Sequence, residues 1–358
     1  MTRLPAIAGM TRAEMESLFD GDSLARVRAG QMADWVYKRG AKFFEEMTDL
    51  PAAVRGRLAA GFAVRPGQVV TEQRSSDGVV KLLMDSFDGQ AYECVLLPFE
   101  ERVSCCISSQ VGCAMGCEFC ATGLSGFDRN LSAGEIVSQV LELQGLSERR
   151  ISHVVFMGMG EPLLNYEEVL KSLRLLNEEI GIGYRHITVS TVGIVPEIYR
   201  LAGEKLPIHL AISLHSPFDD VRSGFMPVNK KWPVAELLQA AKDYYKSTGR
   251  KVTFEYLLIE GVTDTVDQAR GLGALMKGFP TLVNLIPFNY VDTERGFHRP
   301  SNNRVRAFRN ELEAAGVNVT QRMERGHDIA AACGQLKGQH EGKFAKRRSR
   351  LSELPLTS

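Results

Sequence analysis

The sequence predicts an α/β fold in which short parallel strands alternate with helices. From about residue 100 onward, apolar runs rich in β-branched residues recur, with helical patterns between several of them, and such alternation is typical of βα units. The candidate strands are RVSCCIS, HVVFMG, HITVS, HLAISL, KVTFEYLLI and LVNLIPFN. These units are too few for a closed eight-stranded barrel. A partial (β/α)6 barrel and an open doubly wound sheet both fit them.

Smaller regions flank this part of the chain. Residues 1–62 have helical spacing, with Pro51 at the start of a helix over AAVRGRLAAGF, and form a candidate accessory domain. Residues 63–100 contain two Asp-Gly pairs between β-rich runs, which predicts an antiparallel β extension. Residues 101–336 hold the βα units, with GVNVTQR as a candidate edge strand, and residues 337–358 form a basic tail.

Two helices carry clear end signals. Ser132 and Glu135 have the spacing of a capping box at the start of SAGEIVSQVLELQGL. Gly249 stands where it would end the helix over PVAELLQAAKDYYKST.

Composition excludes several classes of protein. Lys and Arg total 43 and Asp and Glu total 43, so the chain is not a strongly basic coat protein for nucleic acid, although local basic patches remain open. No apolar run approaches the ~18 residues that a membrane helix needs, and no secretory signal is recognisable. Seven cysteines, four of them between residues 106 and 120, do not fit a secreted disulfide scaffold. We therefore expect a cytoplasmic protein with a thiolate site and no membrane contact.

The sharpest motif is Cys113-Ala-Met-Gly-Cys117-Glu-Phe-Cys120, a CxxxCxxC spacing after the first βα strand. Three thiolates on one loop can hold three irons of a [4Fe–4S] cluster and leave the fourth iron open to a small molecule. A structural zinc ion would need a fourth ligand, and no second ligand pair follows at zinc spacing. Three buried cysteines without a metal are the remaining alternative.

This spacing, with Phe119 before the last cysteine, resembles the radical S-adenosylmethionine (SAM) superfamily. The resemblance implies that the open iron chelates SAM, that reduction of SAM yields a 5′-deoxyadenosyl radical, and that the fold is a partial (β/α)6 barrel.

Polar residues follow the other candidate strands, where ligands bind in parallel α/β folds. Each one taken alone fits a turn, a helix cap or a satisfied core group at least as well as a ligand contact. Together they predict a pocket for SAM, made by Gly160, Glu161, Ser190, Ser213, His215 and Asn289.

Three further residues are ambiguous by themselves. Cys106 lies on the first strand, and Cys333 lies in GHDIAAACGQL after the last strand, in a Gly-rich segment that could fold back over a barrel mouth. A lone buried cysteine is usually a small hydrophobic residue. Glu93, in AYECVLL, fits a solvent-facing strand position as well as a site.

Longer stretches resemble the RlmN/Cfr family of radical SAM RNA adenine methyltransferases. The resemblance covers about residues 10–340, and the pairing of CxxxCxxC with a distant ACGQL is specific to that family. The matching stretches are RSSDG, CISSQVGCAMGCEFCATG, GMGEPLLNYEEV, HITVSTVGIVP, HLAISLH, MPVNKK, TFEYLLIEGVTD, NLIPFNYV and GHDIAAACGQL.

The resemblance implies a mechanism that uses two SAM molecules per turnover. Cys333 is methylated by the first, and the radical from the second takes a hydrogen from that methyl group. The methylene radical adds to adenine, Glu93 removes the ring proton, and Cys106 attacks Cys333 to form a disulfide that releases the RNA. The residues that the family pattern places on SAM are Gly160, Glu161, Ser190, Ser213, Leu214, His215 and Asn289.

The same resemblance implies partners. The substrate is 23S rRNA, with tRNA at the adenine 3′ of the anticodon as a candidate second substrate. RNA contacts are expected from the amino-terminal helical region and from the tail residues Lys346, Arg347, Arg348 and Arg350. We also expect a low-potential electron donor such as flavodoxin, and a monomer.

Two departures leave alternatives open. Cys105 precedes Cys106, where the family usually has one cysteine. The distance to Cys113 selects Cys106, and Cys105 could take its role if the strand were bulged; strand alternation otherwise points the two side chains to opposite faces. His215-Ser216-Pro217-Phe218 resembles the branch that methylates adenine at C8, whereas NLIPFNYV and ERGHDIAAACGQL resemble the C2 branch, which we favour. The rival functions are a non-catalytic RNA-binding protein with a structural cluster, and a radical SAM enzyme that acts on a small molecule.

Overall fold

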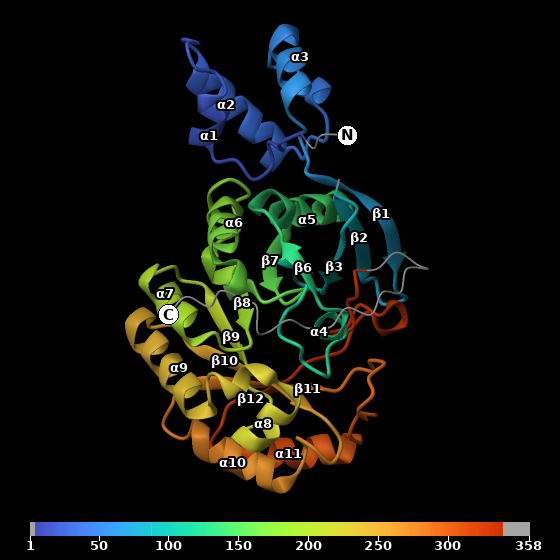
Figure 1. Cartoon of the computed structure of the whole chain (residues 1–358), viewed down its shortest axis with the longest axis vertical. Coiled ribbons are helices and arrows are strands. Elements are labelled where there is room, and N and C mark those ends of the chain that lie inside the picture. The colour runs from blue at the N-terminus through green and yellow to red at the C-terminus, as the bar shows by residue number, and fades with distance from the viewer. Residues whose placement is uncertain (1–3, 87, 339–358) are drawn as a thin grey trace.

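The computed structural model describes residues 4–86 and 88–338. Amino-terminal helices form a layer at one end of the molecule, and the rest surrounds one large sheet (Figure 1). Within the part of the chain that the structure describes, no helix is both long and apolar enough to span a bilayer. Lys346, Arg347, Arg348 and Arg350 of the tail lie outside the described residues.

The central sheet confirms the partial barrel. Its parallel strands follow chain order without a reversal, whereas a doubly wound sheet would reverse at a switch point. The predicted edge strand is present as the last of the parallel strands. They are β4 (Val103–Cys106), β7 (Ile151–Phe156), β8 (Ile187–Thr191), β9 (His209–Ser213), β10 (Val252–Leu258), β11 (Thr281–Pro287) and β12 (Val319–Gln321).

The antiparallel extension joins the same sheet at its other edge. It consists of β1 (Gly67–Arg74), β2 (Val80–Ser86) and β3 (Ala91–Pro98), and β3 pairs antiparallel with β4. A separate two-stranded hairpin, β5 (Gln110–Gly112) with β6 (Phe127–Asn130), interrupts the first βα unit. The cysteine motif therefore follows the first barrel strand, with β5 between the two.

Helices cover the outside of the barrel and follow its strands. Both predicted end signals are confirmed: Ser132 and Glu135 form a capping box, and Gly249 ends its helix with a φ of 66°. The longer helices are α5 (Ala133–Gly145), α6 (Tyr166–Glu178), α7 (Val195–Gly203), α9 (Val234–Thr248), α10 (Val266–Met276) and α11 (Asn302–Ala314). Shorter ones are α4 (Ala121–Ser125), α8 (Asp219–Phe225), η3 (Pro162–Asn165), η4 (Tyr184–His186), η5 (Pro227–Lys230) and η6 (His327–Ile329).

The amino-terminal helices have their own core, which continues onto the barrel. They are α1 (Arg12–Ser17), α2 (Ala25–Ala33) with η1 (Asp34–Lys38), η2 (Phe44–Glu46) and α3 (Ala52–Gly61). Their apolar cluster includes Met15, Phe19 and Met32 together with Val137 and Leu141 of α5. Burial of this shared apolar surface fixes the helices on the barrel.

Two glycines stand where the amino-terminal region approaches the barrel closely. A Cβ at Gly134 would lie 2.2 Å from the Ala8 carbonyl oxygen, and a Cβ at Gly9 would lie 2.5 Å from the Gly134 nitrogen. Gly9 also has a φ of 101°, which disfavours other residues. The docking of the amino-terminal region therefore depends on the absence of a side chain at both positions.

Replacing Gly134 with alanine should destabilise the protein by about 1–3 kcal/mol, because backbone atoms would have to separate. Urea unfolding measures this change. Gly145→Ala, in the same helix with open space around it, is the matched control and should change the free energy of unfolding by less than about 1 kcal/mol. Equal effects of the two variants would show that the close approach is not constrained.

Candidate active site

Two adjoining cavities occupy the barrel interior. One of them, here called the upper cavity, has a volume of about 150 Å³ and is lined by residues that include Cys113, Cys117 and Ser213. The other, here called the lower cavity, has a volume of about 470 Å³ and is lined by residues that include Ser104 and Cys106. The two share lining residues, namely Cys120, Thr122, Met157, Gly158, Glu255, Ile286, Asn289, Arg322, Cys333 and Gly334.

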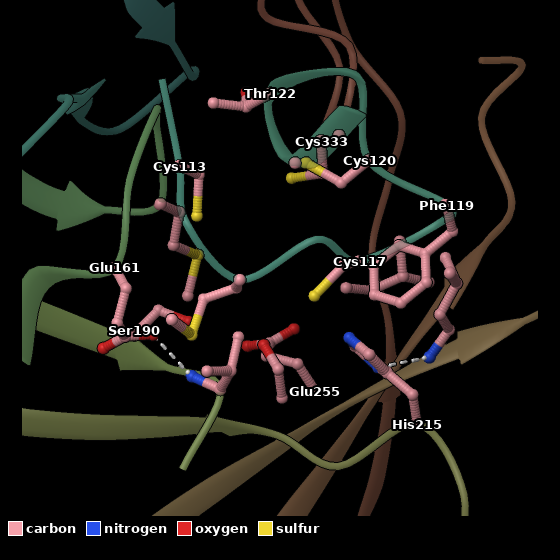
Figure 2. A pocket seen from close by; sticks show the side chains of 18 of the residues that line it. Cys113, Cys117, Phe119, Cys120, Thr122, Glu161, Ser190, His215, Glu255 and Cys333 are labelled. Atoms are coloured by element: carbon pink, nitrogen blue, oxygen red, sulfur yellow. Dashed lines mark hydrogen bonds between the residues drawn. The ribbon is translucent and has the colours of Figure 1, made fainter. Parts of the chain in front are cut away.

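The three cysteines of the motif line the upper cavity from one loop (Figure 2). The loop begins where the Cys113 N–H donates to the Gly126 carbonyl at 2.7 Å. Gly112 has a φ of 74°, and a Cβ there would lie 2.0 Å from the same carbonyl oxygen, so the turn requires glycine. Farther along, the Glu118 N–H donates to the Phe225 carbonyl, which anchors the loop to α8.

Three thiols on one loop match the donor set that the family resemblance implies for a [4Fe–4S] cluster with one open iron. In the described ranges, no group of three or more His, Cys, Asp or Glu residues is arranged to hold one metal ion. A [4Fe–4S] cluster instead takes one thiolate at each of three irons. Burial raises the pKa of the Cys113, Cys117 and Cys120 thiols and so disfavours their ionisation; a positively charged metal in the site would favour the thiolates.

The structure brings most of the strand-end residues to this cavity. Gly160, Glu161, Ser190, Ser213, His215 and Asn289 line it. Leu214 does not: its side chain is fully buried, its N–H donates to the Glu255 carbonyl, and its own carbonyl accepts from Arg222. The expected SAM contact of Leu214 therefore has no counterpart in the lining of the cavity.

Glu161 is already hydrogen-bonded within the protein. Its carboxylate accepts from the N–H of Leu163 at 3.0 Å and from the N–H of Val192 at 2.8 Å. Burial raises the pKa of Glu161 to about 7. The residue thus caps η3, as the structural interpretation of the motif allowed, and also ties the β8 loop to β7. A ligand cation beside it would favour the ionised carboxylate.

Asn289 offers an unused acceptor. Its Nδ2 donates to the Cys333 carbonyl at 3.1 Å, whereas its Oδ1 is buried and has no partner among the described residues. A buried unpaired acceptor is costly, and a ligand N–H would satisfy it. His215 across the cavity is neutral, because burial lowers its pKa to about 3, and its Nδ1 accepts the Leu257 N–H. Both features fit the bound nucleoside part of SAM.

Cys333 lies where the two cavities meet. The segment of residues 326–338, here called the C-terminal segment, is fixed to the cysteine loop by two bonds: the Ala121 N–H donates to the Gly334 carbonyl, and the Thr122 hydroxyl donates to the Leu336 carbonyl, both at 2.7 Å. Figure 2 shows Cys333 beside Cys120. The segment therefore folds back over the barrel as the sequence analysis anticipated.

Cys106 and Cys105 face opposite sides of β4. Cys106 lines the lower cavity together with Cys333, whereas Cys105 is fully buried and lines neither cavity. Burial raises the pKa of Cys106 to about 12; Cys333 adds to this shift, and Arg322 and the Met157 N–H oppose it. The thiol thus needs its cationic neighbour to react as a thiolate.

Glu93 lies behind the C-terminal segment and lines neither cavity. Its carboxylate pairs with the Lys81 ammonium at 3.0 Å and accepts the N–H groups of Lys337 and Gly338 at 2.6 and 3.0 Å. Glu93 is therefore buried and not solvent-facing, and its expected role in catalysis stays a prediction. In this arrangement it holds the C-terminal segment in place.

Three residues of the site were missed by sequence reasoning. Glu255 and Arg322 line both cavities, and both guanidinium Nη atoms of Arg322 lie 3.4 Å from the sulfur of Met157. A carboxylate inside the apolar run TFEYLLI was a usable signal for Glu255. Arg222 had no such signal, yet it is fully buried and donates to the carbonyls of Val192, Ser213 and Leu214.

Family models, relatives and a solved structure all match the chain to radical SAM methyltransferases. Residues 107–269 match the radical SAM superfamily, and residues 6–64 match the ribosomal RNA large subunit methyltransferase N-terminal domain. The chain is 45% identical over 343 residues to proteins of Bacillus thuringiensis (strain Al Hakam) and Bacillus anthracis (strain A0248), each named probable dual-specificity RNA methyltransferase RlmN, with 94% of each chain covered. A crystal structure of a radical SAM methyltransferase from Sphaerobacter thermophilus is 44% identical, with a TM-score of 0.91, 94% of this chain and 100% of that one covered.

Replacing Arg222 with leucine should cost about 3 kcal/mol or more, because several buried carbonyls lose their donor at once. SAM affinity should fall as well, since Arg222 fixes the strand ends that carry Val192 and Ser213. Urea unfolding and calorimetric titration with SAM measure the two effects. Arg222→Lys keeps the charge but not the planar array of donors, so its losses should be smaller than those of the leucine variant. Wild-type stability and affinity in Arg222→Leu would contradict this role.

Proposed function

The chain belongs to the RlmN family of radical SAM RNA methyltransferases, and we propose that it methylates carbon 2 of an adenine in 23S rRNA. The observation that carries this proposal is the position of Cys333 between the two cavities. Cys333 shares the upper cavity with the three cysteines of the motif and the lower cavity with Cys106. A protein that only bound RNA around a structural cluster would need neither Cys106 nor Cys333.

Adenine carbon 2 is electron-poor, so it does not attack the sulfonium methyl group of SAM directly. A [4Fe–4S] cluster held by Cys113, Cys117 and Cys120 would supply the electron that cleaves SAM to a 5′-deoxyadenosyl radical. Cys333 would first accept a methyl group from another SAM molecule, which makes two per turnover. The radical would then take a hydrogen atom from that methyl group, and the resulting methylene would bond to the adenine ring.

Release of the RNA then falls to the chain's own residues. The radical adduct would return one electron to the cluster held by the three cysteines of the motif, and Glu93 would take the proton from the ring carbon. Cys106 attacks the Cys333 sulfur, the carbon–sulfur bond breaks toward carbon, and that carbon is protonated to the product methyl group. For Glu93 to reach the ring, the N–H groups of Lys337 and Gly338 have to leave its carboxylate.

The substrate and partners are proposed as follows. The relatives' names include the words dual-specificity, which supports tRNA as a second substrate, at the adenine 3′ of the anticodon. RNA contacts are assigned to the amino-terminal helices and to the basic tail. A low-potential donor such as flavodoxin supplies electrons in the cytoplasm, and the enzyme works as a monomer.

Nucleoside analysis tests the proposal. Anaerobically reconstituted protein with SAM, a reductant and an unmodified 23S rRNA fragment should give 2-methyladenosine by mass spectrometry. 8-Methyladenosine, the product suggested by His215-Ser216-Pro217-Phe218, would move the reaction to the other ring carbon. Cleavage of SAM without any methylated adenosine in RNA would sink the proposed substrate class and favour a small molecule.

Replacing Cys106 with alanine should trap a covalent protein–RNA adduct, because no thiol remains in the lower cavity to attack Cys333. Denaturing gel electrophoresis with labelled RNA detects the adduct. Cys105→Ala is the matched control: this neighbouring thiol is fully buried and faces neither cavity, so the variant should release its RNA. Normal turnover by Cys106→Ala would show that another group resolves the adduct.

A further inference from the structure

We propose that the lower cavity is the binding site of the target adenine nucleotide, and that the nucleotide enters from the amino-terminal ends of the barrel strands with its phosphate at Arg102. This inference rests on the proposed RNA methylation and adds where and how the nucleotide is held.

The first argument is the position of the cavity relative to the cysteines. Cys113 and Cys117 line only the upper cavity, Cys106 lines only the lower one, and Cys333 lines both. A nucleotide in the lower cavity therefore lies next to both thiols that the release step requires. The volume of about 470 Å³ is within the range of small-molecule sites.

The second argument is the length of the cavity. Arg102, just before β4, and Cys106, at its end, both line it. Four residues of strand separate their Cα atoms by about 13 Å. That span places a base at the Cys106 end when the phosphate of the same nucleotide contacts the long side chain of Arg102. The lower cavity thus joins an anion contact at one end to the reacting thiols at the other.

The third argument is the chemistry of the walls. Val155, Ala211 and Ile286 provide apolar surface for the faces of a base. Between them stand the hydroxyl groups of Ser104 and Thr253 and, from a third strand, Thr188, none of which has a hydrogen-bond partner among the described residues. Hydroxyls both donate and accept, so they match the ring nitrogens and the amino group of adenine.

The fourth argument is the charge at the mouth. The guanidinium groups of Arg102 and Arg325 lie 4.9 and 5.2 Å from the centre of the Phe99 ring, within cation–π range. Arg325 is already paired with Asp77 and donates to the Pro98 carbonyl. Arg102 is exposed, and across residues 4–86 and 88–338 its guanidinium has neither an ion pair nor a hydrogen bond. The Arg102 guanidinium is therefore available to bind the phosphate of the nucleotide.

Protection of Cys106 from alkylation tests the site without any methylation. Cluster-loaded protein with SAM is treated with iodoacetamide under anaerobic conditions, and Cys106 modification is followed by peptide mass spectrometry. Adenosine 5′-monophosphate should slow the modification, and ribose 5-phosphate, which lacks the base, should need about tenfold higher concentration for the same effect.

Arg102→Gln should raise the half-protecting concentration of adenosine 5′-monophosphate about tenfold, the loss of one charge-assisted contact. Thr253→Val, a second variant inside the cavity, should raise it as well. Arg306→Gln, an exposed arginine on α11 that lines neither cavity, is the matched control and should leave it unchanged. The urea unfolding midpoints of all three variants should stay near that of the wild type, which would show that the variants remain folded.

Lack of protection, equal protection by ribose 5-phosphate, or an unchanged half-protecting concentration in both cavity variants would overturn the inference. These outcomes are separate from the fate of the proposed function. Wild-type protein that makes 2-methyladenosine but shows no protection places the nucleotide elsewhere. Protection without RNA methylation leaves the nucleotide site standing and removes the proposed reaction.

Discussion

The site depends above all on how the C-terminal segment is fixed across the barrel. Two hydrogen bonds from α4, made by the Ala121 N–H and the Thr122 hydroxyl, and one from Asn289 hold the backbone around Cys333. These bonds join positions that are 44 to 214 residues apart in the chain. Without them the upper cavity would lack one wall, and the thiols of Cys333 and Cys106 would not share the lower one. The separation of the barrel interior into two adjoining cavities follows from this closure.

Desolvation is the second constraint on the site. Burial raises the pKa of Cys106 and of the three cysteines of the motif, so none of these thiols ionises easily without help. The cluster proposed for the motif would provide that help. For Cys106 the neighbouring cation is Arg322, whose own pKa is raised by Cys333 and Glu255. Methylation of Cys333 would convert it to an uncharged thioether and leave Arg322 facing a single ionisable thiol. The order of the proposed steps therefore suits the electrostatics of the cavity.

Rigid support of the strand ends comes from Arg222, which lines neither cavity, and from Glu161, which lines the upper one. Arg222 donates to carbonyls at the ends of β8 and β9 from a fully buried position, and Glu161 joins β7 to the β8 loop. Such bonds fix the strand ends that a ligand contacts, which keeps the cost of ordering them out of the binding step. The amino-terminal helices add to this support through α5, whose apolar face they cover.

The sequence by itself determined the alternation of strands and helices, the helix ends at Ser132 and Gly249, and the cysteine motif, because periodicity, capping and ligand spacing are all properties of neighbouring residues. It also identified most of the strand-end residues, since parallel strands bring their carboxyl ends together. Only the tertiary structure decided that Cys106 and not Cys105 faces Cys333, that Leu214 lies outside the cavity lining, and that Glu93 holds residues 337 and 338. Those outcomes, like the roles of Arg222 and Arg322, come from contacts between distant parts of the chain, and no local pattern encodes which buried groups will meet.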